Sequence, residues 1–330
     1  MVRPRIAIVF TGGTISMLLD PVTGAAVPTL DGAAILARSP GLTALADLVP
    51  VDWGLVPASH LSFAQILDIA SVIRGLAARS DVDGVVVVQG TDVIEETSFA
   101  FDLLVDAPEP VVVVGAMRNA SDPGYEGPGN LRDAVLAAAS RDLRGEGTVV
   151  VMGGRILPAD DVTKTHTSAY DTFDARNLGA IGVVTGDGAI VGRRRAARRL
   201  LRDTPVAAAE PIAIVTATVA SDGAPLRWAV AGGARGIVVA ATGAGNTHPD
   251  LLAAAEAAMA GGIPVVLASR VPSGRVAPAY GFPGGGARWI AAGAIPAGFL
   301  TPVKARIALA LGIGSGLAGD GLRALFADPR

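Results

Sequence analysis

The sequence contains no cysteine, and only 4% of its 330 residues are aromatic and 17% charged. Without a thiol the chain can form no disulfide, no thiolate metal site and no cysteine nucleophile. Its three histidines, His60, His166 and His248, lack a spacing that suggests a metal-ligand set. The composition therefore excludes the commonest metal and thiol chemistries.

Strong charge and long apolar runs are also missing. The formal net charge is −3, so neither nucleic acid nor an anionic membrane is expected as a partner. No apolar run approaches the roughly 20 residues of a membrane span. The first residues enter a strand without the apolar region of a secretory signal, and a cytoplasmic protein is expected.

Hydrophobic residues make up 51% of the chain, enough for a sizeable core, and the length favours two domains. Strand patterns alternate with helix patterns, which predicts an α/β protein. We expect a larger N-terminal domain with a mostly parallel sheet and flanking helices, followed by a smaller C-terminal α/β domain. The expected strands are 6–10, 51–56, 85–88, 111–114, 148–152, 212–216, 237–240 and 265–268, and the main helices 63–79, 128–141, 302–311 and 317–326.

The predicted domains are residues 1–190 and 212–330, joined by a linker over 191–211. Residues 192–203 of this linker carry six arginines. A basic run of this kind occurs in nucleic-acid-binding proteins, but no aromatic residues interrupt this one. A solvated linker is therefore the preferred interpretation. A second prediction, from composition, is a flexible loop over residues 17–29, where Asp20-Pro21, Thr23-Gly24 and Pro28 are typical of loops.

The most informative stretch is the valine run 85–88, which predicts a strand buried on both faces. The run ends at Gly90, and Thr91 and Asp92 follow at the strand's carboxyl end, where open α/β sheets bind their ligands. The alternative interpretation is that Asp92 only caps the following helix and Thr91 only fills the turn.

Other strand ends carry similar chemistry. Thr11 and Thr14 flank two glycines, which lack the remaining residues of a dinucleotide or P-loop motif. Ser59 and His60 follow another strand. Lys164 lies in a polar loop and is either a surface lysine or, beside a carboxylate and a hydroxyl, a base.

Together these segments resemble the signature motifs of bacterial-type L-asparaginases, of the asparaginase/glutaminase family. The matching segments occur in the right order over nearly the whole chain and are Phe10-Thr11-Gly12-Gly13-Thr14-Ile15-Ser16, Val88-Gln89-Gly90-Thr91-Asp92-Val93-Ile94-Glu95-Glu96-Thr97, Gly115-Ala116-Met117-Arg118, Asp161-Val162-Thr163-Lys164-Thr165, Gly245-Asn246 and Ser269-Arg270-Val271-Pro272-Ser273-Gly274. Several separated motifs in one order are far more specific than any of them alone.

The resemblance implies a threonine-based amidohydrolase that needs no cofactor. Thr11 would be the nucleophile, and Thr91, Asp92 and Lys164 would handle protons. The implied substrate-binding residues are Ser59, His60, Thr91, Asp92, Ala116 and Asn246. Asn246 would reach the site of a neighbouring subunit, which implies a homotetramer built as a dimer of dimers.

Two family features are missing from the sequence. No tyrosine occurs in residues 15–30, where the family usually has one in its mobile loop. No acidic residue occurs between Val271 and Gly319, although the family usually has a glutamate that would fall near Gly281. The remaining candidates for the base that deprotonates Thr11 are Lys164, which is preferred, and Tyr280.

The expected function is hydrolysis of L-asparagine to L-aspartate and ammonia through a threonine acyl-enzyme. One alternative is a family amidohydrolase that prefers another amide, such as L-glutamine. The other is a weakly active amino-acid-binding homologue, which the two missing groups favour.

Overall fold

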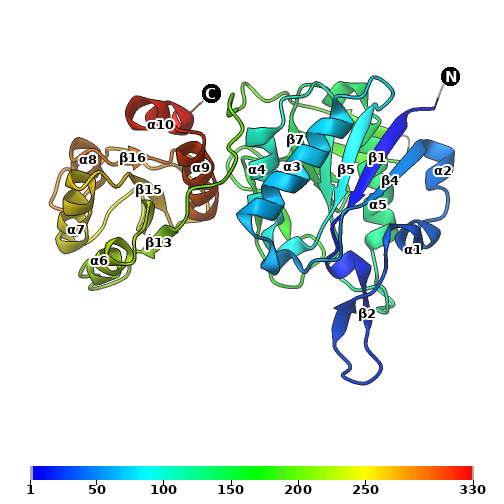
Figure 1. The fold of residues 1–330 in the computed structure, drawn as a ribbon, viewed down its shortest axis with the longest axis horizontal. Helices are drawn as coiled ribbons and strands as arrows, with labels where there is room; N and C mark the ends of the chain where they lie inside the picture. The colour runs from blue at the N-terminus through cyan, green and yellow to red at the C-terminus, as the bar shows by residue number, and fades with distance from the viewer. Residues whose placement is uncertain (1–2, 187, 329–330) are drawn as a thin grey trace. The chain divides into compact units, whose positions relative to one another are not determined.

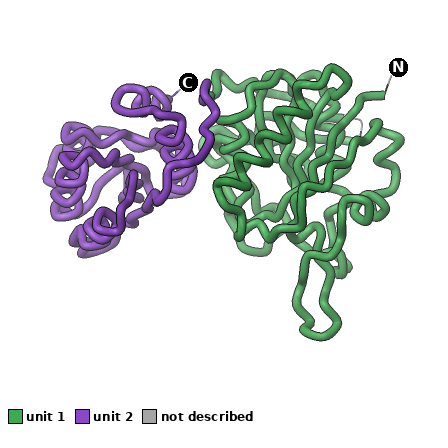
Figure 2. The backbone as a smooth tube through the Cα atoms, in the orientation of Figure 1, with its two compact units in different colours: residues 1–200 green, residues 201–330 purple. Residues whose placement is uncertain are grey.

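A computed structural model describes residues 3–186 and 188–328 of the chain. The chain forms two compact units, residues 1–200 and 201–330 (Figure 2). Both are built from alternating strands and helices (Figure 1). The predicted α/β class is therefore confirmed, with a larger N-terminal and a smaller C-terminal part.

An eight-stranded sheet forms the centre of the first unit, in the order β12-β11-β8-β7-β6-β5-β1-β4. The five strands from β7 to β4 run parallel, and β8, β11 and β12 are added antiparallel. Their bounds are β1 Arg5–Phe10, β4 Asp47–Asp52, β5 Gly84–Val88, β6 Val111–Val114, β7 Thr148–Met152, β8 Arg155–Pro158, β11 Gly182–Thr185 and β12 Gly188–Val191.

The valine runs explain why β5 and β6 lie in the middle of this sheet. Every residue of both strands is buried, as expected where helices cover both faces of a parallel sheet. The helices of this unit are α1 Gly32–Ala37, α2 Leu42–Leu45, α3 Phe63–Ala77, α4 Ile94–Leu104 and α5 Gly127–Ala138, with short 3₁₀ turns η1 Thr14–Ser16, η2 Ala58–His60, η3 Thr91–Val93 and η4 Arg141–Leu143. Helices α3 and α4 pack against each other, and so do α2 and α5.

The second unit contains a four-stranded parallel sheet in the order β13-β14-β15-β16. Its elements are β13 Ile212–Thr216, α6 Ala224–Ala231, β14 Gly236–Ala241, α7 Pro249–Ala260, β15 Val265–Ser269, α8 Gly286–Ala291, β16 Ile295–Pro296, α9 Pro302–Gly314 and α10 Gly319–Phe326. Its core surrounds the fully buried Trp289. Within the described residues, no helix is long and apolar enough to cross a lipid bilayer.

The edge strand β4 lies four residues earlier than the strand predicted at 51–56. Its sequence contains Pro50, whose missing N–H is tolerated at a sheet edge. Its apolar stretch, residues 48–51, contains this proline, which argues against a strand, and no residue of the strand is fully buried. The structure instead sets its position through parallel pairing, with Arg5 opposite Asp47 and Phe10 opposite Asp52.

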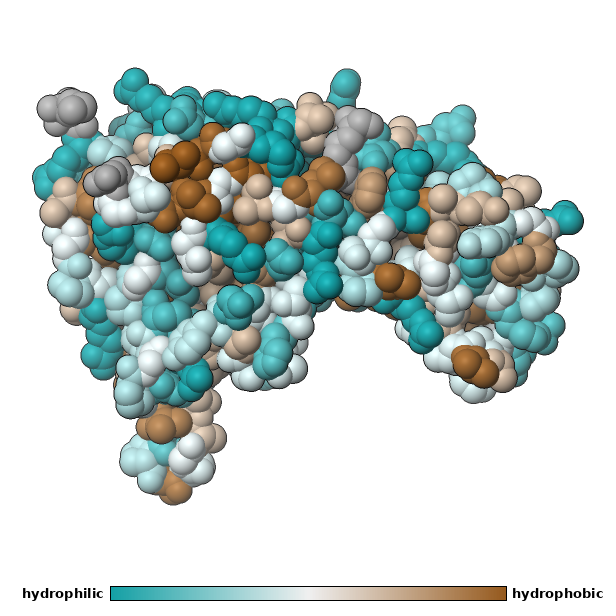
Figure 3. Space-filling view, turned by 180° about the vertical axis from the view of Figure 1, so that it is seen from behind, coloured by the Kyte–Doolittle hydropathy of each residue, from teal (hydrophilic) through white to brown (hydrophobic). Residues whose placement is uncertain are grey.

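The predicted loop over residues 17–29 is a β-hairpin instead. Strands β2 Met17–Leu19 and β3 Ala26–Pro28 pair antiparallel, and the Asp20 carboxylate accepts hydrogen bonds from the backbone N–H groups of Val22 and Thr23 in the turn. The hairpin projects from the first unit (Figures 1 and 3). Its exposed apolar side chains include Leu19 and Val22, which are 49% and 90% exposed. We call residues 17–28 the flap hairpin.

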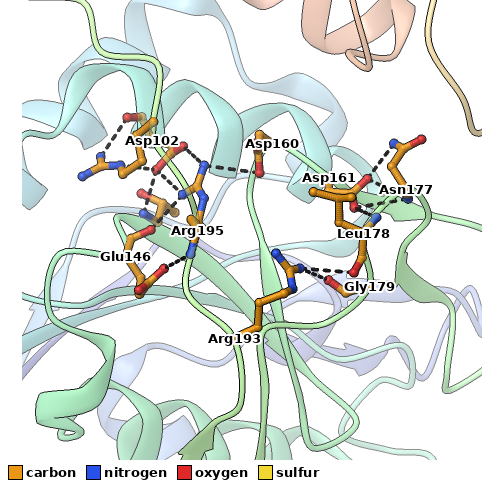
Figure 4. Close-up of polar contacts among 11 residues, drawn as sticks. Asp102, Glu146, Asp160, Asp161, Asn177, Leu178, Gly179, Arg193 and Arg195 are labelled. Carbon is orange, nitrogen blue, oxygen red and sulfur yellow. Dashed lines mark hydrogen bonds and ion pairs between the residues drawn. The ribbon is translucent and has the colours of Figure 1, made fainter. Parts of the chain in front are cut away.

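The expectation of a solvated arginine linker is wrong for Arg195 and Arg198. Both guanidinium groups bind the fully buried carboxylate of Asp102 on α4, Arg195 through two hydrogen bonds of 2.8 and 3.1 Å and Arg198 through one of 3.0 Å. Arg195 also pairs with Asp160 at 3.2 Å (Figure 4). The basic run therefore ties its own segment into the first unit. The limits of the linker at 191–211 stay a prediction.

Asp102 is held ionised by these neighbours. Burial alone would raise the pKa of Asp102, but the positive charges of Arg195 and Arg198 outweigh burial and hold the pKa below its usual range. Removing one partner of a buried pair leaves an uncompensated charge, which is strongly destabilising.

We expect Asp102→Asn to lower the free energy of unfolding by about 3–5 kcal/mol at neutral pH, measured by urea denaturation. Because the pKa of Asp102 is lowered in the folded protein, the stabilisation by its carboxylate is fully present above the ordinary aspartate pKa. This stabilisation is lost as the pH falls through the lowered pKa. The gap between the variant and the wild type should therefore narrow in acid. Asp81→Asn, at an exposed Arg79 pair, is the control and should change little. Equal effects of the two substitutions on the free energy of unfolding would contradict the stabilising role of the buried Asp102 carboxylate.

Candidate active site

Three neighbouring parallel strands, β1, β5 and β6, end at the same edge of the large sheet, where ligands of open α/β sheets bind. Thr11 follows β1, Thr91 follows β5 and Ala116 follows β6. All three residues are buried. The N–H and the hydroxyl group of Thr11 both donate to the carbonyl oxygen of Val88, each at 3.0 Å. The last residue of β5 therefore fixes the Thr11 side chain.

Glycines allow these strand ends to approach closely. A Cβ atom on Gly13 would lie 2.1 Å from both the Cα and the N atom of Gly90. A Cβ atom on Gly115 would lie 2.6 Å from the carbonyl oxygen of Gln89. Gly13 also has a φ of +91°, which favours glycine. The loops that carry Thr11, Thr91 and Ala116 can therefore meet only because side chains are missing at these positions.

Lys164 reaches this edge from a different part of the chain. Its Nζ donates to the Thr91 hydroxyl at 3.1 Å and to Asp92 Oδ1 at 2.9 Å. The Lys164 side chain is 15% exposed, whereas the Asp92 side chain is 66% exposed. The structure thus brings the predicted hydroxyl, amine and carboxylate together. Asp92 does not cap α4, because that helix has no side-chain N-cap hydrogen bond.

Lys164 is the last residue of strand β9, Val162–Lys164, which pairs with β10, Phe173–Ala175. Just before β9, the Asp161 carboxylate accepts hydrogen bonds from the amides of Asn177 and Leu178 (Figure 4). The neighbouring Asp160 pairs with Arg195. These contacts anchor the residues just before β9. The prediction of a polar loop at this position is correct only for the flanks of the strand.

The loop after β6, residues 115–118, is held by side chains from α5 and from the turn that precedes it. Asn130 Nδ2 donates to the carbonyl oxygen of Gly115 at 3.0 Å. The Glu126 carboxylate accepts from the backbone N–H groups of Met117 and of Arg118, the latter at 3.3 Å. Sequence analysis did not single out Glu126, which precedes α5, or Asn130 in its first turn, because residues 119–125 separate both from the site loop.

Ser59 and His60 lie in η2, which packs against η3. Both residues are exposed, and the closeness of Ala58 Cβ to Gly90 places them beside the Thr91 segment. Asn246 belongs to the second unit. Its side-chain oxygen accepts from the N–H of Gly286 at 3.3 Å, at the start of α8. The sequence-predicted residues of the first unit thus gather at one sheet edge, and Asn246 is fixed separately.

The sequence lacks the tyrosine that the family usually has in residues 15–30 and the glutamate expected near Gly281. Neither residue has a direct substitute at its expected position. Gly281 has open space around a hypothetical Cβ atom, and its carbonyl oxygen accepts from Arg288 Nε. However, the hydroxyl of Tyr125 donates to the carbonyl oxygen of Ile15 at 2.8 Å. A tyrosine therefore reaches the loop after Thr11 from a distant segment. Among residues 3–186 and 188–328, no group of three or more His, Asp or Glu side chains could hold a metal ion.

The fold has two α/β units, and a hydroxyl, an amine and a carboxylate meet at a parallel-sheet edge. These features fit the class of amidohydrolases, and the family comparison agrees with this class. Residues 5–197 match the N-terminal asparaginase domain, and residues 211–326 match the C-terminal domain of glutaminases and asparaginases. The chain belongs to the asparaginase family.

Curated relatives cover nearly the whole chain. The chain is 37% identical over 332 residues to a probable L-asparaginase of Deinococcus radiodurans, which covers 98% of this chain and 97% of that protein. It is 32% identical over 333 residues to L-asparaginase 2 of Escherichia coli, with 94% and 89% covered. It is 31% identical over 324 residues to a probable periplasmic L-asparaginase of Haemophilus influenzae, with 94% and 88% covered. The resemblance predicted from the motifs is therefore confirmed.

The contact between Gly13 and Gly90 gives a testable prediction. Gly13→Ala should cost about 1–3 kcal/mol through overpacking, in addition to about 1–3 kcal/mol for a side chain in the extended positive-φ conformation of Gly13. Gly24→Ala is the matched control, because Gly24 also has a positive φ but nothing within 4 Å of its Cβ position. Denaturant unfolding measures both variants. Equal losses would show that the close approach is unimportant.

Proposed function

We propose that the protein hydrolyses L-asparagine to L-aspartate and ammonia through an acyl-enzyme on Thr11. The observation that carries this proposal is the contact of Lys164 Nζ with both Thr91 and Asp92, beside a buried Thr11 on the neighbouring strand. The names of the relatives support asparagine as the substrate. The asparaginase family membership fits an amidohydrolase.

In the proposed reaction, Thr11 Oγ1 attacks the side-chain carbonyl carbon of asparagine, and the hydroxyl proton passes to a base. Collapse of the tetrahedral intermediate breaks the C–N bond, and the departing amide nitrogen takes a proton and leaves as ammonia. Water then attacks the ester and releases aspartate and Thr11. Backbone N–H groups near Gly12 and Thr91 would stabilise the negative oxygen that forms in both steps.

The Thr91, Asp92 and Lys164 group would handle the protons in this scheme. In the structure the Thr11 hydroxyl donates to Val88 and makes no hydrogen bond to Lys164, so Thr11 must turn from the Val88 carbonyl before it attacks.

Ser59, His60 and Asp92 would hold the polar groups on the substrate's α-carbon, and Ala116 would meet the departing amide. Asn246 would complete the site of a neighbouring subunit in a dimer of dimers. The cytoplasmic location stays a prediction.

Thr11→Ala should lower the rate of ammonia release from asparagine by several powers of ten, because it removes the covalent nucleophile. Wild-type activity should survive extensive treatment with a chelator. The assay is coupled detection of ammonia with asparagine, glutamine and other amides at equal concentration. Thr14→Ala is the matched control at the same loop. Undiminished activity of Thr11→Ala, or a preference for another amide, would reject the corresponding part of the proposal.

Shared active sites predict complementation between two inactive variants. Thr11→Ala and Asn246→Ala subunits, mixed and reassembled in equal amounts, should regain about a quarter of wild-type activity, since half of random dimers are hybrids with one intact site. Sedimentation of the active species measures its assembly in parallel. No recovery on mixing, or an active monomer, would refute a site completed by Asn246.

A further inference from the structure

Two adjacent residues outside the proposed site, Tyr125 and Glu126, each hold one of its loops. They lie in the turn before α5. The Tyr125 hydroxyl donates to the carbonyl oxygen of Ile15 at 2.8 Å, in the loop that begins at Thr11. The Glu126 carboxylate accepts from the N–H groups of Met117 and Arg118, in the loop that contains Ala116. Neighbouring positions on one turn therefore set the spacing of two site loops.

The Tyr125 ring fits this place because the first residue of α5, Gly127, has no side chain. A Cβ atom on Gly127 would lie 2.3 Å from Tyr125 Cζ. Burial, and then the negative charge of Glu126, raises the pKa of Tyr125 to about 12. The phenol is therefore neutral at physiological pH and remains a hydrogen-bond donor to Ile15. A group with this pKa is unsuited to accept a proton near neutrality.

The same turn also holds the base of the flap hairpin. Ala120 N–H donates to the carbonyl oxygen of Met17 at 2.9 Å, and Leu19 N–H donates to Ser121 Oγ at 3.0 Å. The Tyr170 hydroxyl supports the turn from outside through a 3.0 Å hydrogen bond to the carbonyl oxygen of Gly124. The flap and both site loops are thus tied to one braced segment.

We propose that Tyr125 and Glu126 are positioning residues, which fix the distance between the Thr11 loop and the Ala116 loop. This proposal rests on the proposed amide hydrolysis. Attack on an amide requires the nucleophile and the groups around the leaving nitrogen to be held within a fraction of an ångström of the reactive geometry. The Thr11 loop and the Ala116 loop carry those groups, but no hydrogen bond joins the two loops directly within the described residues. Both loops pack on the Gln89–Gly90 segment, and the turn adds a hydrogen-bonded connection between them.

The first test is Tyr125→Phe, which removes one hydroxyl and keeps the ring. We expect kcat for asparagine to fall about tenfold, KM to change less than about twofold, and the shape of the pH–rate profile to stay the same. Ser39→Ala is the matched control, because it removes a buried hydroxyl that donates to the carbonyl oxygen of Ile35 at 3.0 Å, outside both site loops. It should destabilise the protein to a similar extent and leave kcat unchanged.

Glu126 is tested by two substitutions. Glu126→Gln replaces one acceptor oxygen by an NH₂ group that cannot accept, and should lower kcat, whereas Glu126→Asp keeps both acceptors and should partly restore it. Because both residues set one distance, the loss in the Tyr125→Phe, Glu126→Gln double variant should be smaller than the product of the single losses. Multiplicative losses, or equal effects of Tyr125→Phe and Ser39→Ala on kcat, would overturn the proposal. A shifted pH profile in Tyr125→Phe would overturn it in favour of direct proton transfer.

Hydrogen exchange separates this proposal from the proposed function. In Tyr125→Phe, peptides covering residues 11–17 should exchange faster than in wild type, and in Ser39→Ala they should not. If the wild type releases no ammonia from any amide, the proposed function fails while this measurement still decides whether the turn fixes the loop. Unchanged exchange in Tyr125→Phe would overturn the positioning role by itself.

Discussion

The backbones of Gly13 and Gly90 lie so close together that a single methyl group would not fit between them. This contact depends on the parallel pairing of β1 with β5, which aligns Phe10 with Val88. It brings Thr11 and Thr91 to the same sheet edge and lets one carbonyl, that of Val88, bind both the N–H and the hydroxyl of Thr11. The rest of the proposed site is arranged around these two strand ends.

The other groups are brought to this edge by part-buried polar contacts. Asp161 and the Asp160–Arg195 pair hold the segment before β9, and β9 presents Lys164 to Thr91. Glu126 and Tyr125 hold the loops after β6 and β1. Burying charges is costly unless they are paired. Here Asp161 and Glu126 each accept from at least two donors, and Asp160 pairs with Arg195. This explains how short loops, which are usually mobile, can support chemistry that requires fixed distances.

The parallel strands could be predicted because buried valine runs have a clear pattern, and the strand-end threonines follow directly from them. Local signals were not sufficient elsewhere. Pro50 and partial burial hide β4, and turn residues in the flap hairpin indicate a loop but not the pairing of its strands. The arginine run has the local pattern of a solvated linker, since the buried partner of Arg195, Asp102, lies 93 residues away. Tyr125 and Ile15 are 110 residues apart, so no short motif records their contact.

The central claim is that Thr11 forms the acyl-enzyme with its proton taken by the group around Lys164. The most direct test is quenched-flow mass spectrometry of intact protein during turnover of asparagine, with wild type, Lys164→Met and Lys164→Arg. An aspartyl adduct on Thr11 should form in the wild type within one turnover and should not form in Lys164→Met. Accumulation of the adduct in Lys164→Met would show that Lys164 serves only the later attack by water, and an adduct on Thr91 instead of Thr11 would contradict the assignment of the nucleophile.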